Sequence, residues 1–249
     1  MLTVLLCAVG VGGATMLGAV IGYLCRGITH RFSDAVLAFG AGVSIASAVL
    51  GLIIPSLEYG GRWGLAVAVV GIFAGAFAVD ALGKALPEAH KFVGFGADTD
   101  SRRVTRVMIF ILAIAMHNLP EGIAAGVGFG SDDISGAVFI ALGIALQNLP
   151  EGMVIIAPML ACGISPGRTL TCALLTGAVE VIGTFIGYFA VSLSQAILPF
   201  SLAFAGGTML YVVSNDMIPE THSDGNAVSS TYALLVGFSL MLAFYALMP

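Results

Sequence analysis

The sequence predicts an all-α integral membrane protein with eight transmembrane helices. Hydrophobic residues make up 59% of its 249 residues and charged residues only 9%, whereas a soluble domain carries about 25% charged residues. Apolar stretches recur at roughly the 20-residue length that a membrane span requires. Two of these stretches contain nearly the same polar hexapeptide with a proline, so we expect helices four and five to be broken by Pro around a central site.

The eight helices follow one another with short connections. We expect them at about residues 2–25, 33–56, 63–84, 104–129, 134–160, 168–193, 198–217 and 227–248. The first stretch lacks a basic segment and a cleavage motif, which indicates a span rather than a signal peptide. The chain 1–249 is therefore expected to form a single transmembrane domain with one longer loop, at about 85–103.

Glycines four residues apart favour close packing of helices within the bundle, because they let two backbones approach. Four pairs show this spacing: Gly18 and Gly22, Gly71 and Gly75, Gly122 and Gly126, and Gly183 and Gly187. The four cysteines form no Cys-x-x-Cys pair, which favours apolar packing over a disulfide or a thiolate metal site. No basic tract suggests nucleic acid as a partner.

The basic residues predict that both termini lie outside the cytoplasm. With the N-terminus outside, the cytoplasmic side holds Arg26, Arg31, Lys84, Lys91, Arg102, Arg103, Arg106 and Arg168. Of the nine Lys and Arg residues, only Arg62 then lies outside, as the positive-inside rule demands. The 85–103 loop is cytoplasmic in this orientation.

The most informative feature is the repeated hexapeptide, His-Asn-Leu-Pro-Glu-Gly at 117–122 and Gln-Asn-Leu-Pro-Glu-Gly at 147–152. The likeness extends to seven of nine positions between 114–122 and 144–152. A carboxylate at bilayer depth marks a pathway or a ligand site. A proline there frees backbone carbonyls, which must be buried in protein or line a cavity. We interpret the pair as pseudo-symmetric halves of one site.

Helical geometry gathers the polar side chains of each hexapeptide on one face. Glu121 lies about 40° and Asn118 about 100° around the helix from His117. The second copy repeats this arrangement, with Glu151 between Gln147 and Asn148.

Imidazole, carboxylate and amide ligands suit divalent ions such as zinc, cadmium, iron, nickel or manganese. A third acid, Glu180 in span six, is expected to face the bundle interior as a ligand of a second, adjacent cation. Alternatively it balances charge or carries a proton. A lone amide in a span can also simply join helices, but the duplication favours a ligand site.

A few polar residues outside the hexapeptides are candidates for a path that leads cations to and from this site. Asp216 and Glu220 lie four residues apart at the cytoplasmic end of span seven, and His222 follows. They form either an exit station for cations or a solvated helix end. Ser44 in span two either contributes an oxygen to the pathway or packs between helices.

These motifs resemble those of the ZIP (Zrt-, Irt-like protein) family of divalent metal transporters. The Gln-first motif with Ala-Leu-Gly-Ile-Ala-Leu before it, at 141–146, is similar to the GufA-like branch. Residues 204–213, leading to Ile218-Pro219-Glu220, extend the likeness into span seven. It covers essentially the whole chain.

The resemblance implies an eight-helix bundle in the cell membrane that imports divalent metal, zinc by preference, through alternating access, frequently as a homodimer. The primary site that it implies comprises His117, Glu121, Gln147 and Glu151. The implied second site comprises Asn118, Glu121, Asn148, Glu151 and Glu180. Some members carry His or Asp where this chain has Gln147 and Asn148, so its second site is expected to be weaker. Some also use a ligand such as Met near Ser44.

Two other functional classes explain the sequence less completely. An intramembrane zinc enzyme would need a ligand pair with a general base, such as His-Glu-x-x-His, and the chain has no such motif. A proton-linked carrier of organic solutes would explain Glu180, but not the grouping of His117 with amides.

Overall fold

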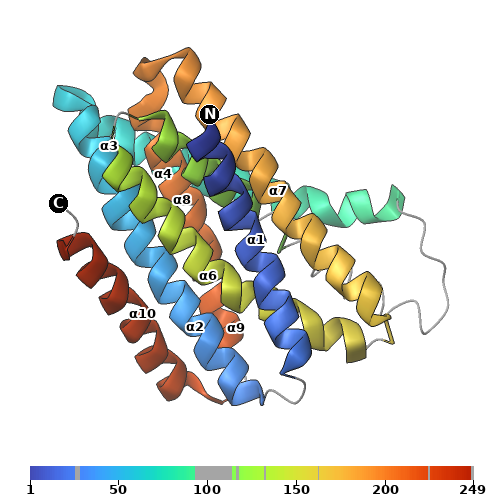
Figure 1. Ribbon diagram of the computed structural model, residues 1–249. Coiled ribbons are helices and arrows are strands. Elements are labelled where there is room, and N and C mark those ends of the chain that lie inside the picture. The colour runs from blue at the N-terminus through green and yellow to red at the C-terminus, as the bar shows by residue number, and fades with distance from the viewer. Residues whose placement is uncertain are drawn as a thin grey trace.

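The computed structural model describes residues 1–25, 29–92, 114–115, 118–131, 133–161, 163–223 and 225–247. Within those ranges the regular structure is entirely helical, and the long helices form one bundle (Figure 1). The helices are α1 (Leu2–Leu24), α2 (His30–Ala46), η1 (Ser47–Ile53), α3 (Ile54–Tyr59), η2 (Gly61–Trp63), α4 (Gly64–Phe92), α6 (Ile134–Ala161), α7 (Pro166–Leu193), η3 (Gln195–Ile197), α8 (Leu198–Val212), η4 (Val213–Met217), α9 (Ile218–His222) and α10 (Ala227–Leu247). Residues 118–130 form a further helix.

Six helical segments in the described ranges are long and apolar enough to cross a membrane. They are Leu2–Leu24, Arg31–Tyr59, Gly61–Lys84, Ile134–Ala157, Pro166–Leu193 and Ala227–Leu247. Large apolar side chains are exposed on them, among them Phe73 and Phe77 of α4, as in helices that face lipid.

The eight-span count stays a prediction. Residues 104–113 and 116–117 of span 104–129 lie outside the described residues, and span 198–217 is divided between α8 and η4. The expected loop at 85–103 begins later than predicted, because α4 continues to Phe92. Ala85 and Leu86, which follow the span, are good helix formers.

The start of α1 and the end of α10 lie at the same end of the bundle (Figure 1). The side-chain amide of Asn226, just before α10, donates to Asp34 Oδ2 at the start of α2, over 2.8 Å. Helix α1 ends near the start of α2, and α10 begins near the same point. The start of α1 and the end of α10 therefore lie together at the opposite end of the bundle, as they do in a chain that crosses a membrane an even number of times.

The predicted packing role of the glycine pairs is confirmed. A Cβ atom on Gly126 would lie 2.0 Å from the carbonyl oxygen of Thr184, so nothing larger fits between these helices. Gly18 and Gly22 lie against α6, Gly71 and Gly75 against α8, Gly122 and Gly126 against α7, and Gly183 and Gly187 against helix 118–130.

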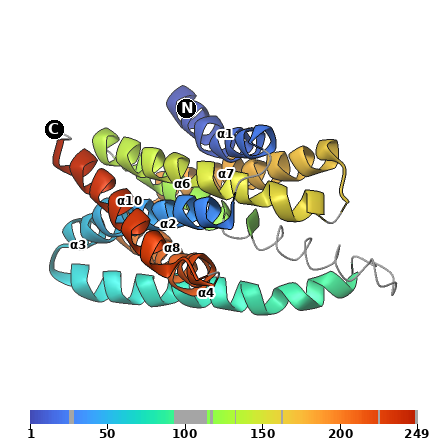
Figure 2. The same cartoon turned by 90° about the horizontal axis from the view of Figure 1, so that it is seen from below.

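These contacts divide the bundle into two groups. The first helix group is α1, helix 118–130, α6 and α7, and the second is α2, α4, α8 and α10 with the short segments between them. In Figure 2, α1 and α4 lie at opposite edges of the bundle. The groups meet where α2 crosses α6, and a Cβ atom on Gly143 would lie 3.0 Å from that of Ser47.

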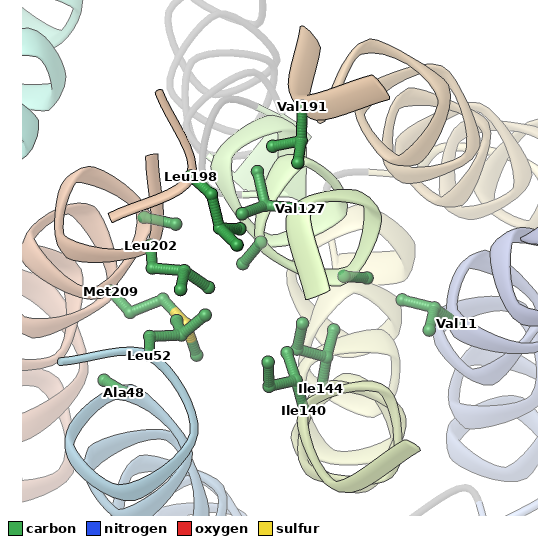
Figure 3. Close-up of a cluster of buried hydrophobic side chains, with 13 residues drawn as sticks. Val11, Ala48, Leu52, Val127, Ile140, Ile144, Val191, Leu198, Leu202 and Met209 are labelled. Atoms are coloured by element: carbon green, nitrogen blue, oxygen red, sulfur yellow. The ribbon is translucent and has the colours of Figure 1, made fainter. Parts of the chain in front are cut away.

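An apolar cluster also joins the two groups. Figure 3 shows Val11, Val127, Ile140, Ile144 and Val191 from the first group directed toward side chains of η1 and α8, including Leu52, Leu202 and Met209. Its members are largely Ala, Val, Ile and Leu, which pack closely without polar atoms to satisfy. The apolar side chains of this cluster therefore fill the space between the two helix groups at this point.

The predicted break of a helix at Pro150 is not confirmed, because α6 runs unbroken from Ile134 to Ala161. Proline removes only one backbone donor from the helix. Its ring has room beside Gly40 of α2, where a Cβ atom added to the glycine would lie 3.4 Å from Pro150 Cγ. Pro120 likewise lies within helix 118–130. The α-helical pattern changes instead to π-helix at η1 and η4, just before Pro55 and Pro219.

Candidate metal centre

Six of the predicted ligand residues are buried in the first helix group. Helix 118–130 carries two of them, α6 three and α7 one. Their exposed fractions are 0% for Asn118, Gln147, Asn148 and Glu180, 3% for Glu121 and 7% for Glu151. His117 lies outside the described residues. The structure thus gathers the described part of the predicted site.

The two repeats meet directly, since Gln147 Nε2 donates to Glu121 Oε1 over 2.5 Å. Asn148 Nδ2 donates to Glu180 Oε1 over 2.7 Å and to the carbonyl oxygen of Val11 over 3.1 Å.

Asn118 follows the same pattern, and its Nδ2 donates to the carbonyl oxygen of Thr176 over 3.2 Å. Each of the three amides thus uses its NH₂ group to contact another helix, and this leaves the amide oxygen for other partners.

Four buried oxygen atoms in the site accept no hydrogen bond from the described part of the chain. They are Asn118 Oδ1, Glu121 Oε2, Gln147 Oε1 and Asn148 Oδ1. Buried acceptors are nearly always paired, and all four belong to predicted ligands. Oxygen atoms of this kind coordinate divalent cations, so besides joining helices through their NH₂ groups these side chains have oxygen atoms suited to a cation.

Electrostatics favour a cation as well. The carboxylates of Glu121, Glu151 and Glu180 are close enough for their charges to interact. Among the described residues no Lys or Arg is buried, so these acids have no fixed positive charge beside them in that part of the chain. A dication would offset their repulsion.

Amides rather than acids supply most of the free oxygens. In the ranges that the structure describes, no group of three or more His, Cys, Asp and Glu has a metal-binding arrangement. Three of the four oxygens without a donor come from Asn118, Gln147 and Asn148.

The structure adds α1 to the site, which the sequence did not predict. Thr15 is fully buried and its Oγ1 donates to Glu180 Oε2 over 3.5 Å. Gly12 allows this approach, since a Cβ atom there would lie 2.3 Å from the carbonyl oxygen of Gly177. A threonine one turn from glycine in an apolar span was the available signal.

The predicted route residues lie in the second helix group. Ser44 is buried in α2, Asp216 is half-buried in η4, and Glu220 is exposed in α9. The His222 ring contacts the carbonyl oxygen of Ile218 over 2.8 Å and Thr231 Oγ1 over 3.3 Å. Helix α2, which carries Ser44, packs beside the second hexapeptide, since a Cβ atom on Gly40 would lie 3.6 Å from the carbonyl oxygen of Gln147.

Asp80 of α4 is a further acid that the sequence did not single out. Its Oδ1 accepts a hydrogen bond from the Tyr211 hydroxyl over 3.1 Å, and its Oδ2 pairs with Lys84 Nζ at 2.5 Å. Asp216 interacts electrostatically with the same tyrosine. Polar groups of α4, α8 and η4 therefore gather near the predicted exit.

Comparisons with known proteins agree with this chemistry. The family described as ZIP Zinc transporter matches residues 89–244. The chain is 35% identical to the zinc transporter GufA of Myxococcus xanthus, over 93% of each chain. It is 35% identical to the zinc transporter ZIPB of Bordetella bronchiseptica, over 92% of this chain and 76% of that protein. It is 29% identical to the zinc transporter ZupT of Chlorobaculum parvum, over 92% of this chain and 91% of that one.

Proposed function

Because the chain belongs to the ZIP zinc transporter family, we propose that this multi-pass membrane protein moves zinc into the cytoplasm by alternating access. The observation that carries the proposal is the set of four buried oxygen atoms without hydrogen-bond donors in the described residues, three from amides and one from Glu121. All four belong to residues of the two hexapeptides, which contact each other through Gln147 and Glu121.

In this proposal each ligand type has a role. Glu121 and Glu151 supply negative charge, which reduces the cost of holding a dication in an apolar interior. The amide oxygens of Gln147 and the two asparagines replace part of the ion's hydration shell, and His117 adds an imidazole. Glu180 serves a neighbouring second cation. The same ligands tolerate cadmium, iron, manganese and nickel.

Access to the site changes when one helix group moves against the other. This step is supported by the distribution of the ligands, all of whose described members lie in the first helix group. The second helix group contributes the route, through Ser44 and then Asp216, Glu220 and His222, with Asp80 as an added acid. Both termini are extracytoplasmic in this account, and the protein works as a homodimer in the lipid bilayer.

The relatives are transporters, so we propose no enzymatic activity. A proton-linked carrier of organic solutes remains the alternative with acids at the same positions, and it requires no metal binding. A zinc titration therefore separates the two.

The test is calorimetric titration of the purified protein in detergent with zinc and then cadmium. We expect saturable binding that falls at least tenfold in Glu121→Ala, because this change removes a ligand and a charge. Glu58→Ala is the matched control, since Glu58 is an exposed acid at the end of α3. Equal zinc affinity in folded Glu121→Ala and Glu58→Ala would contradict the proposed site.

A further inference from the structure

Thr15 differs from the other buried threonines in what its hydroxyl contacts. Thr176, Thr184 and Thr208 each donate to a carbonyl oxygen of their own helix, over 2.9, 2.9 and 2.6 Å. That is the usual arrangement for threonine within a helix. Thr15 instead donates to the carboxylate of Glu180, on another helix and 165 residues away.

The Glu180 carboxylate links this hydroxyl to the free oxygens of the metal centre. Its Oε2 accepts from Thr15, and its Oε1 accepts from Asn148 Nδ2 over 2.7 Å. Asn148 Nδ2 also donates to the Val11 carbonyl. Since the NH₂ and the oxygen of an amide lie on opposite sides of its carbon, holding Nδ2 fixes the direction of Oδ1.

The backbone of α1 is itself tightly placed. A Cβ atom on Gly152 would lie 2.0 Å from the carbonyl oxygen of Thr15. The Val11 side chain belongs to the apolar cluster that joins the helix groups (Figure 3). The close packing of α1 thus fixes the positions of the Val11 carbonyl and the Thr15 hydroxyl relative to Asn148 and Glu180.

We propose that Thr15 is a positioning residue of the zinc site, acting through Glu180 on the direction of the Asn148 amide oxygen. This inference rests on the proposed function. Without the hydroxyl, Glu180 Oε2 would lose its described donor, and the carboxylate could turn away from Asn148. Asn148 Nδ2 would then keep only the Val11 carbonyl as acceptor, and Asn148 Oδ1 would be directed toward the cation less firmly.

The experiment compares zinc affinities measured by calorimetry on purified full-length variants. Thr15→Val removes the hydroxyl at nearly constant volume and Thr15→Ser retains it. Thr208→Val is the matched control, because Thr208 is equally buried and its hydroxyl donates within α8. Losing a group that holds a metal ligand in place costs about 10- to 100-fold in affinity. We expect about a tenfold loss in Thr15→Val, with affinities near wild type in the other two.

A double variant separates positioning from general packing. If Thr15 acts through Glu180, adding Thr15→Val to Glu180→Ala weakens zinc binding no further, as expected for residues of one network. A Thr15→Val affinity within twofold of wild type would overturn the proposal, as would a full tenfold additional loss in the Glu180→Ala background. If the wild-type protein binds zinc but does not transport it, the proposed transport function is contradicted. The role of Thr15 is not affected by that result, because it is decided by the zinc affinities of the variants.

Discussion

At the scale of single residues, the site depends on three amides that donate to neighbouring helices and keep their oxygen atoms unbonded within the described chain. Asn148 is the most connected, since its Nδ2 contacts both the Val11 carbonyl and Glu180. Its neutral side chain also avoids a further negative charge beside the three carboxylates. Asn148 is therefore proposed to stabilise the metal-free protein through these two hydrogen bonds as well as to bind the cation.

Replacing this amide by a carboxylate tests that dual role. In Asn148→Asp the NH₂ donor is lost and a charge is added beside Glu180, so we expect the free energy of unfolding to fall by about 1–3 kcal/mol without zinc. The stabilisation by saturating zinc should grow, because a dication offsets the added charge. Melting temperatures with and without zinc measure both effects. Asn215→Asp, an exposed control, should change neither, and a variant equal to this control would refute the assignment.

The sequence predicts these residues as ligands because the duplicated hexapeptide marks them, and that assignment stays a prediction. It could not identify the Val11 carbonyl, since a backbone oxygen has no sequence signature, and the only signal for Thr15 is its place one turn after Gly12 in an apolar span. Their role follows from the approach of three helices, which depends on packing far from the repeat.

At the scale of helices, glycine positions predicted close packing correctly, whereas prolines did not predict helix breaks. Pro150 stays within α6, because a helix can lose one backbone hydrogen bond when the ring has space. The changes to π-helix before Pro55 and Pro219 share no sequence signal, since η1 is largely apolar whereas η4 carries Ser214, Asn215 and Asp216.

Adjacent glycines of α1 provide a matched test of helix packing. A Cβ atom on Gly12 would lie 2.3 Å from the carbonyl oxygen of Gly177, whereas one on Gly13 would meet nothing within 4 Å. Gly12→Ala should therefore lower the free energy of unfolding by about 1–3 kcal/mol through overpacking, and should weaken zinc binding by displacing Thr15. Gly13→Ala should be neutral or stabilising by about 0.5–1 kcal/mol. Equal melting temperatures for the two variants would show that α1 and α7 do not approach so closely.

At the scale of the whole molecule, the account requires the two helix groups to move relative to each other. The sequence could predict neither group, because group membership is a property of contacts between distant helices. The charge pattern predicts that both termini are extracytoplasmic, and this orientation stays a prediction; in the structure α1 begins at the end of the bundle where α10 ends (Figure 1).

Crosslinking the two groups should stop transport without removing the site. Positions 47 and 143 are suitable, since a Cβ atom on Gly143 would lie 3.0 Å from that of Ser47, and a small shift would give disulfide geometry. In a background without the four native cysteines, oxidised Ser47→Cys/Gly143→Cys should bind zinc but lose at least tenfold in influx, with recovery on reduction. The single variants are controls. Unchanged influx in verified crosslinked protein would rule out movement at this contact.

The central claim is that zinc crosses the membrane through the paired hexapeptides. The most direct measurement is zinc influx into liposomes that contain the purified protein and an internal zinc-sensitive dye. The account predicts saturable influx for the wild type and for Glu58→Ala, and its loss in His117→Ala and Glu121→Ala at equal protein incorporation. Influx at the wild-type rate in Glu121→Ala, or none in folded wild-type protein that binds zinc, would contradict it.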